Sequence, residues 1–182
     1  MTRILLLLVI CGAVSEVAAT TYLERADFLG QAFDGQSPDA RILWLSSENQ
    51  QAAATILGHP YAGLRVRYWQ RNNRSAWILD EIGKEKPITI GLVIESNRIR
   101  DLYILAFRES RGGEIRYPFF TSQFKGLSLK SNSRLDGSVD GITGATLSVG
   151  AVKRIANFAL YLEQGFMESE LADIAAPLGT RR

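Results

Sequence analysis

The chain has 182 residues, of which 46% are hydrophobic and 22% charged, values that suit one globular domain with its own core. Lys and Arg number 21 against 19 Asp and Glu, a formal net charge of +2, which argues against a nucleic-acid partner because such proteins concentrate positive charge. One Cys and one His are too few for zinc, iron–sulfur or CxxCH haem sites. We therefore expect no metal site, and demanding chemistry must come from an organic cofactor, carboxylates or hydroxyls.

Residues 1–19 predict a secretory signal peptide. Arg3 gives a positive start, residues 4–14 are almost wholly apolar, and small residues at 17–19 precede a cleavage point. The apolar run is shorter than the ~20 residues of a transmembrane helix, although an uncleaved membrane anchor is the alternative. Cleavage would also remove Cys11, the one thiol. We expect a periplasmic protein, either free or associated with a membrane.

The first elements after the signal peptide combine helix and strand patterns. Apolar residues at helical spacing predict a helix over residues 22–33, and a short apolar run predicts a strand over 42–45. Ser47 and Gln50 have the spacing of a capping box and open a second helix, which stops at Gly58.

The middle of the chain predicts a sheet. Breaks too short for parallel crossovers separate four β-rich runs, which favours an antiparallel meander. A long apolar helix over residues 147–164 follows, ended by Gly165. The predicted class is α+β, a curved antiparallel sheet flanked by helices in a single domain over residues 20–165, with a C-terminal tail over 166–182. The four runs are residues 64–70, 76–82, 88–95 and 99–107.

The segment directly before the last predicted helix carries the strongest functional signal, Asp-Gly-Ile-Thr-Gly-Ala-Thr at residues 140–146. Its final Thr lies at or near the helix N-cap, where the N–H groups of residues 147–149 have no partner within the helix, and such an end binds phosphate. A plain loop with an N-cap threonine is the alternative. The small residues and hydroxyls around this end are Gly144, Ala145, Thr143, Thr146 and Ser148.

The pattern Asp-x-x-(Ser/Thr)-Gly-Ala-Thr resembles the flavinylation motif of FMN-binding domains similar to those in the sodium-pumping NADH:quinone oxidoreductase and Rnf complexes. In that family an FAD:protein FMN transferase moves FMN from FAD onto the last Thr of the motif as a phosphoester. The resemblance implies that Thr146 is the acceptor and that Asp140 is the acid that the transferase recognises. It also implies that Thr143 is the upstream hydroxyl and Ser148 the hydroxyl that follows the acceptor.

A second, weaker match lies in the glycine turn after the last predicted strand, followed by Gln-Phe-Lys-Gly at residues 123–126. The family has a Glu-Thr-Pro-Gly-x-Gly loop near the flavin ring and then a Gln-Phe-x-Gly segment. Glu109, Ser110 and Gly112 resemble parts of that loop, but its Pro is missing and Arg111 stands in it. An Arg111 beside the flavin would favour the anionic reduced form; the alternative is that Arg111 faces solvent.

Together these resemblances imply a periplasmic electron-transfer flavoprotein that carries covalent FMN on Thr146. Its partners would be the transferase, a membrane-bound reductase that supplies electrons, and an acceptor such as a cytochrome. The sequence has no Gly-x-Gly-x-x-Gly dinucleotide fingerprint, so we expect that the protein does not oxidise NAD(P)H itself and acts as a redox carrier rather than as an enzyme in isolation. The alternatives are a flavin-dependent reductase of a small acceptor and a cofactor-free binding module that keeps the fold.

Overall fold

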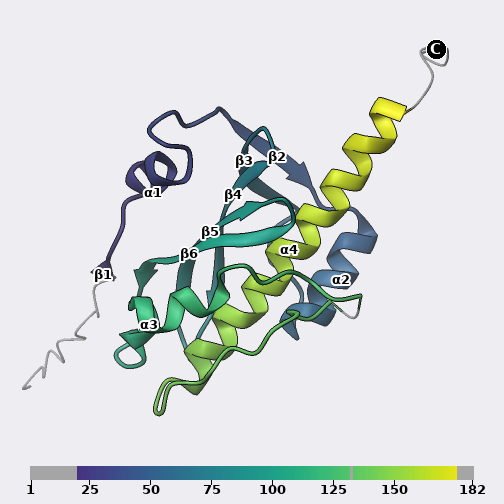
Figure 1. Ribbon diagram of the computed structural model, residues 1–182. Coiled ribbons are helices and arrows are strands. Elements are labelled where there is room, and N and C mark those ends of the chain that lie inside the picture. Colours follow the sequence, from purple (N-terminus) through teal and green to yellow (C-terminus); the bar gives the residue numbers. More distant parts are fainter. Residues whose placement is uncertain (1–19, 132, 176–182) are drawn as a thin grey trace, which may run out of the picture.

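The computed structural model describes residues 20–131 and 133–175, with side chains as far as residue 166. Six antiparallel strands form one open sheet in the spatial order β1-β6-β5-β4-β3-β2 (Figure 1). The strands are β1 (Thr20–Thr21), β2 (Ala40–Trp44), β3 (Arg65–Arg71), β4 (Arg74–Ile82), β5 (Pro87–Glu95) and β6 (Arg98–Phe107). The helices are α1 (Arg25–Ala32), α2 (Ser47–Leu57), α3 (Pro118–Thr121) and α4 (Thr146–Ala175), with 3₁₀ turns at Gly113–Arg116 and Ser122–Phe124.

The centre of the sheet is the predicted meander. Strands β3 to β6 pair with their sequence neighbours, and their connections are tight turns. Ser96 and Asn97, between β5 and β6, both have positive φ values of 52° and 60°, the conformation of a hairpin turn that matches strand twist. Strand β2 follows α1 in the sequence and joins the sheet as its far edge, paired with β3. The predicted α+β fold with a curved antiparallel sheet is confirmed.

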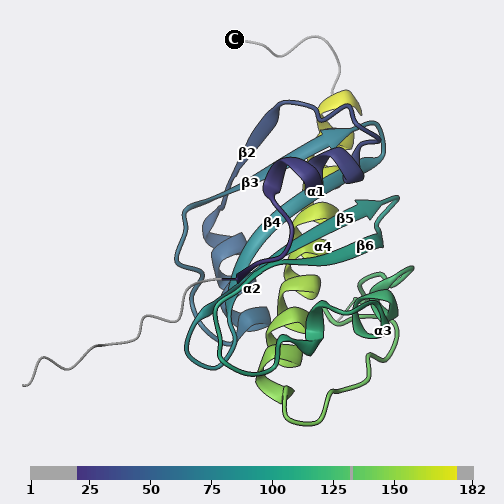
Figure 2. The same ribbon diagram turned by 90° about the vertical axis from the view of Figure 1, so that its left-hand side faces the viewer.

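Helices lie on both faces of the sheet (Figure 2), and each face carries its own core. Helices α2 and α4 cover one face, where Trp77, Ile90 and Ile155 are fully enclosed. Helix α1 covers part of the other face with Phe28 and Leu29. This small core needs close approach, because a Cβ on Gly91 of β5 would lie 2.8 Å from the Phe28 ring.

Several predicted helix boundaries differ from the observed ones. Helix α1 begins at Arg25 and ends at Ala32, inside the predicted range of residues 22–33. The N-cap of α2 is Ser46, whose Oγ accepts a 3.2 Å hydrogen bond from the Asn49 N–H, so the cap falls one residue before the predicted Ser47. The C-cap Gly58 is as predicted, in the left-handed region at φ 80°. At the other end of the chain, Gly165 does not stop α4, which continues to Ala175; a helical Gly costs only about 1 kcal/mol relative to Ala.

The predicted boundary between domain and tail therefore falls inside a helix. Residues 166–175 extend α4 beyond the sheet (Figure 1), whereas residues 176–182 lie outside the described part. The predicted signal peptide with Cys11 also lies outside the described residues. Within the described part, no helix has the length and apolar character that a bilayer span requires.

Candidate functional site

The start of α4 presents unpaired backbone donors. The Ala145 carbonyl accepts the first helical hydrogen bond, 2.9 Å from the Val149 N–H, and the Ala145 N–H donates to Ile142 over 3.0 Å. Gly144, in the turn between them, has φ +85°, a conformation that favours glycine. The N–H groups of residues 146–148 have no hydrogen-bond partner among the described residues. The prediction that the Val149 N–H is free is therefore wrong by one residue, because Ala145 is the N-cap.

Thr146 is the first residue of this helix, and it is exposed. Its neighbours differ in their surroundings: Ala145 and Ser148 are buried, whereas Thr143 and Gly144 are exposed. The Thr146 hydroxyl therefore lies at the open end of a helix, whereas the Ser148 hydroxyl is buried. Such an end attracts anions through its unpaired N–H groups and the helix dipole.

The predicted glycine turn packs directly on this helix start. Gly112 is buried with φ +88°, and a Cβ at this position would lie 2.7 Å from Ser148 Oγ and 3.5 Å from the Ala145 Cβ. Only a glycine permits both this backbone conformation and this approach. The structure thus joins the two segments, more than thirty residues apart, that the sequence marked separately.

A cavity of about 460 Å³ opens between the glycine turn and the motif. That volume lies within the ~300–1,000 Å³ of small-molecule sites. Thr146 lies just past this wall, at the first position of α4. The lining contains Ser110, Arg111, Gly112 and Gly113 from the turn, Glu114, Arg116 and Tyr117 from the segment after it, Phe107 from β6, and Thr143 and Gly144 from the motif.

Arg116, which the sequence did not single out, is the most firmly held cation in this lining. Its guanidinium carbon lies 4.8 Å from the centre of the Tyr22 ring and 4.3 Å from that of Tyr117. The same group donates hydrogen bonds to both phenol oxygens and to the Gly113 carbonyl. Arg111 also lines the cavity, but it is exposed and makes no such side-chain hydrogen bond within residues 20–131 and 133–175. Its neighbour Tyr117 is the one local feature of the sequence that could have drawn attention to Arg116.

The Glu109 carboxylate faces the turn between β4 and β5. Its Oε1 accepts hydrogen bonds from three backbone N–H groups, those of Lys84 (2.8 Å), Glu85 (2.6 Å) and Lys86 (2.8 Å). Burial opposes ionisation of this carboxyl, but the three donors outweigh it and hold the pKa of Glu109 below its ordinary value. This carboxylate oxygen closes the turn from which β5 starts, so Glu109 fixes the position of the glycine turn that follows it.

Asp140 is held through its backbone. Its N–H donates a 2.7 Å hydrogen bond to Gln123 Oε1, and the adjacent Val139 carbonyl accepts a 2.9 Å bond from Lys153 Nζ on α4. The Asp140 side chain is exposed and is not part of the cavity lining. That position leaves the carboxylate accessible on the surface, six residues before Thr146.

One known protein family matches the part of the chain that contains both of these segments. Residues 83–161 match the sequence profile of the FMN-binding domain family. This part of the chain, a little under half of its length, is similar to FMN-binding domains. It contains both the glycine turn and the Thr146 motif, which lie on either side of the cavity.

The fold has a counterpart among solved structures. The crystal structure of NqrC from Shewanella oneidensis aligns with a TM-score of 0.60 at 16% sequence identity, over 81% of this chain and 96% of that chain. At this identity the likeness concerns the fold. A search of curated proteins found no match.

The residues present fit an FMN phosphate and ring system. Three unpaired N–H groups at residues 146–148 suit a phosphate. Gly112 and Gly144, both at positive φ, lack side chains, so a ligand in the cavity can approach their backbone closely. Tyr117 and Arg116 supply aromatic and cationic surfaces for a planar ring that gains negative charge on reduction.

Proposed function

We propose that this protein is a secreted electron carrier whose FMN is joined to Thr146 through a phosphoester. The observation that carries the proposal is the place of Thr146: an exposed hydroxyl on the first residue of α4, beside the cavity, in the part of the chain that matches the FMN-binding family. The motif's resemblance to a flavinylation site supports the covalent linkage. A cofactor attached in this way stays with a carrier that works outside the cell's cofactor pool.

The linkage requires a transferase and FAD. Thr146 Oγ forms a bond to the phosphorus of the FMN half of FAD, the pyrophosphate P–O bond to the AMP half breaks, AMP leaves, and the hydroxyl proton is lost. The exposed Asp140 carboxylate is available to an FAD:protein FMN transferase that recognises the motif. The phosphodiester then carries its negative charge at the N-terminus of α4, where the dipole contributes about 0.3–2 kcal/mol.

FMN supplies one- and two-electron transfer when bound, and the protein positions it. The Gly112 turn and the first turn of α4 fix the two walls of the cavity through their mutual contact. Arg116, held between Tyr22 and Tyr117, places a positive charge in the lining. Such a charge favours the anionic reduced cofactor over the neutral oxidised one.

The partners and the compartment follow from the same proposal. Residues 1–19 direct the chain to the periplasm, free or held at the membrane. A membrane-bound reductase loads the flavin and an acceptor such as a cytochrome unloads it. Electron-transfer complexes of this kind bury small interfaces. Such brief contacts suit a single domain with a modest net charge of +2.

Co-expression with an FAD:protein FMN transferase tests the linkage. Intact mass spectrometry should find the mass of one FMN less one water on the wild-type protein and on Thr55→Val, an exposed threonine of α2 outside the motif, and the unmodified mass on Thr146→Val. Yellow colour should survive denaturing electrophoresis in the first two only. A colourless wild-type protein, or a flavin that stays bound to Thr146→Val after denaturation, would refute the linkage. Turnover of a small acceptor by the isolated protein would favour a reductase instead.

A further inference from the structure

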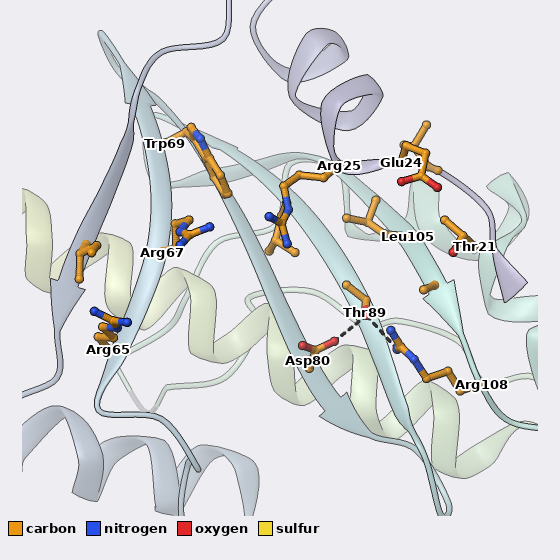
Figure 3. Close-up of a pocket in the computed structure, with 14 residues that line it drawn as sticks. Thr21, Glu24, Arg25, Arg65, Arg67, Trp69, Asp80, Thr89, Leu105 and Arg108 are labelled. Carbon is orange, nitrogen blue, oxygen red and sulfur yellow. Dashed lines mark hydrogen bonds between the residues drawn. The ribbon is translucent and has the colours of Figure 1, made fainter. Parts of the chain in front are cut away.

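The face of the sheet that α1 leaves partly open contains a second cavity, far from Thr146 in the fold. It measures about 440 Å³ and lies between α1 and the β2–β3 edge, over the middle of β4 and β5 (Figure 3). Helix α4 with the candidate FMN site covers the opposite face (Figure 2). We call this cavity the arginine groove, after the four arginines in its lining: Arg25, Arg65, Arg67 and Arg108.

Two of these arginines have no counter-charge. Arg25 on α1 and Arg67 on β3 point toward the same space from opposite sides (Figure 3), and neither makes a hydrogen bond or ion pair within residues 20–131 and 133–175. Arg65 stacks over the exposed Trp44 ring at 5.7 Å. Like charges that converge on one space repel each other, and a bound anion relieves that repulsion.

The acidic residues of the groove do not neutralise Arg25 and Arg67. Asp80 accepts a 2.6 Å hydrogen bond from Thr89 Oγ1, which in turn accepts one of 3.0 Å from Arg108 Nη1. Arg108 also donates to the Pro87 carbonyl. Thr89 therefore links Asp80 and Arg108 by hydrogen bonds at one end of the groove (Figure 3). Glu24 lines the rim without an ion pair among the described residues.

Apolar side chains lie beside the unpaired arginines. Ile42 on β2 is in register with Arg67 and is 46% exposed, which is unusual for an Ile on a paired strand. Trp69, Ile78 and Leu105 continue the apolar surface across the sheet. A ligand that covers this surface would gain about 25 cal/mol for each Å² of apolar area removed from water.

We propose that the arginine groove binds an organic anion with an apolar body, a carboxylate or phosphate monoester on an aliphatic chain. The anionic head lies between Arg25 and Arg67, since guanidinium groups bind carboxylate and phosphate oxygens in pairs. The chain lies over Ile42 and Ile78. The volume of the groove fits a small molecule, and the site is independent of the FMN proposal because no residue is shared with the cavity beside Thr146.

Isothermal titration calorimetry with four probes tests the proposal on the purified protein. Decanoate and decyl phosphate should bind. Inorganic phosphate, which lacks the chain, and decanol, which lacks the charge, should bind at least about tenfold more weakly. Comparison of the first two probes separates a carboxylate site from a phosphate site. Added salt should weaken decanoate binding, because the site is open to solvent.

Variants identify the groove as the place of binding. Arg25→Gln/Arg67→Gln should lower decanoate affinity at least about tenfold. The matched control is Arg41→Gln on β2, one residue from Ile42, because its guanidinium bonds to Gln70 Oε1 and is not part of the lining. Thermal unfolding of both variants should match the wild type, since these arginines support no core.

The proposal would be overturned by no binding of either decyl anion, by equal binding of decanol, or by unchanged affinity in the double variant. Binding of an acidic peptide in preference to decanoate would assign the groove to a protein partner and would also overturn it. Thr146→Val, with no FMN attached, should bind decanoate as the wild type does. Failure of the flavin linkage therefore leaves this proposal standing, and failure of decanoate binding leaves the flavin proposal standing.

Discussion

The Oε1 atom of Gln123 accepts a 2.7 Å hydrogen bond from the backbone N–H of Asp140. Gln123 belongs to the 3₁₀ turn Ser122–Phe124, whose Phe124 is buried in the main core. The bond therefore anchors the strap, by which we mean residues 139–145 before α4, to a rigid part of the domain. Lys153 holds the same strap from α4 through the Val139 carbonyl. Two independent contacts thus set where the motif begins.

Gln123→Leu should loosen this strap. The substitution removes two hydrogen bonds, the one from the Asp140 N–H and one of 3.2 Å from Gln123 Nε2 to the Phe119 carbonyl. At about 0.5–1.5 kcal/mol for each bond, the free energy of unfolding should fall by about 1–3 kcal/mol, measured by urea denaturation. Loading of FMN by a transferase should also slow, because the motif would sample more conformations before the transferase binds it. The control is Gln51→Leu on α2, an exposed Gln. Equal stability and equal loading in both variants would show that the Gln123–Asp140 bond has no positioning role.

Gly112→Ala should be more damaging than an ordinary loop substitution. The new Cβ meets an unfavourable φ of +88° and lies 2.7 Å from Ser148 Oγ, so the glycine turn must move away from α4. We expect a loss of about 1–3 kcal/mol in unfolding free energy. Gly35→Ala is the matched control, because Gly35 has φ +82° with open space around it and reports the backbone cost alone.

A double variant separates the two contributions at Gly112. Ser148→Ala removes the oxygen that the new Cβ would meet, so Gly112→Ala/Ser148→Ala should recover part of the loss. The Ser148 Cβ is 3.5 Å from the added atom and presents no clash. If the two substitutions are additive in urea denaturation, the steric part of the explanation is wrong.

Arg116→Gln should lower the midpoint potential of the flavoprotein, a prediction that rests on the proposed function. A positive charge in the lining stabilises the anionic reduced cofactor, and each ~1.4 kcal/mol lost over two electrons lowers the potential by about 30 mV. Spectroelectrochemical titration measures the change. Arg116→Lys keeps the charge and should lie between the two. Arg111→Gln, at the cation that the sequence indicated, should shift the potential less, because Arg111 is exposed and unrestrained.

Unchanged potentials in Arg116→Gln would contradict this assignment, and a larger shift in Arg111→Gln would return the role to Arg111. Tyr22→Leu provides a further check, since it removes one ring and one hydrogen-bond partner of Arg116. A shift in the same direction as Arg116→Gln is expected, because the guanidinium would no longer be fixed.

Local patterns in the sequence predicted most of the elements, although not β1 or α3, and they did not predict every contact. Alternating apolar residues and short breaks predicted β3 to β6, since each strand pairs with its neighbour. The Gly112–Ser148 contact, in contrast, depends on how a turn and a helix pack. Arg116 was missed because one of its two tyrosines, Tyr22, is 94 residues away. The continuation of α4 past Gly165 depends on helix residues that outweigh one glycine.

The lone His, itself exposed, belongs to an ionic cluster around a buried carboxylate on the main-core side of the sheet. The Glu81 carboxylate on β4 is 2% exposed and contacts two cations, Arg154 of α4 at 2.7 Å and His59 at 3.1 Å. His59 Nδ1 also lies 3.0 Å from the Pro60 carbonyl. Both ring nitrogens donate at once only in the imidazolium form, because neutral imidazole has one N–H. This cluster ties the C-cap of α2 to the sheet.

Stability should depend on the protonation of His59. The hydrogen bond to Pro60, followed by the one to Glu81, raises the pKa of His59 above its ordinary value of 6.5. A raised folded-state pKa adds stability that is fully present below the unfolded value and is lost as pH rises through the folded value. The difference in unfolding free energy between wild type and His59→Gln should therefore be largest near pH 5.5 and shrink toward about pH 8.5, across the ordinary range of His. Urea denaturation along this series measures it, and a difference that stays constant with pH would mean that His59 acts without its charge.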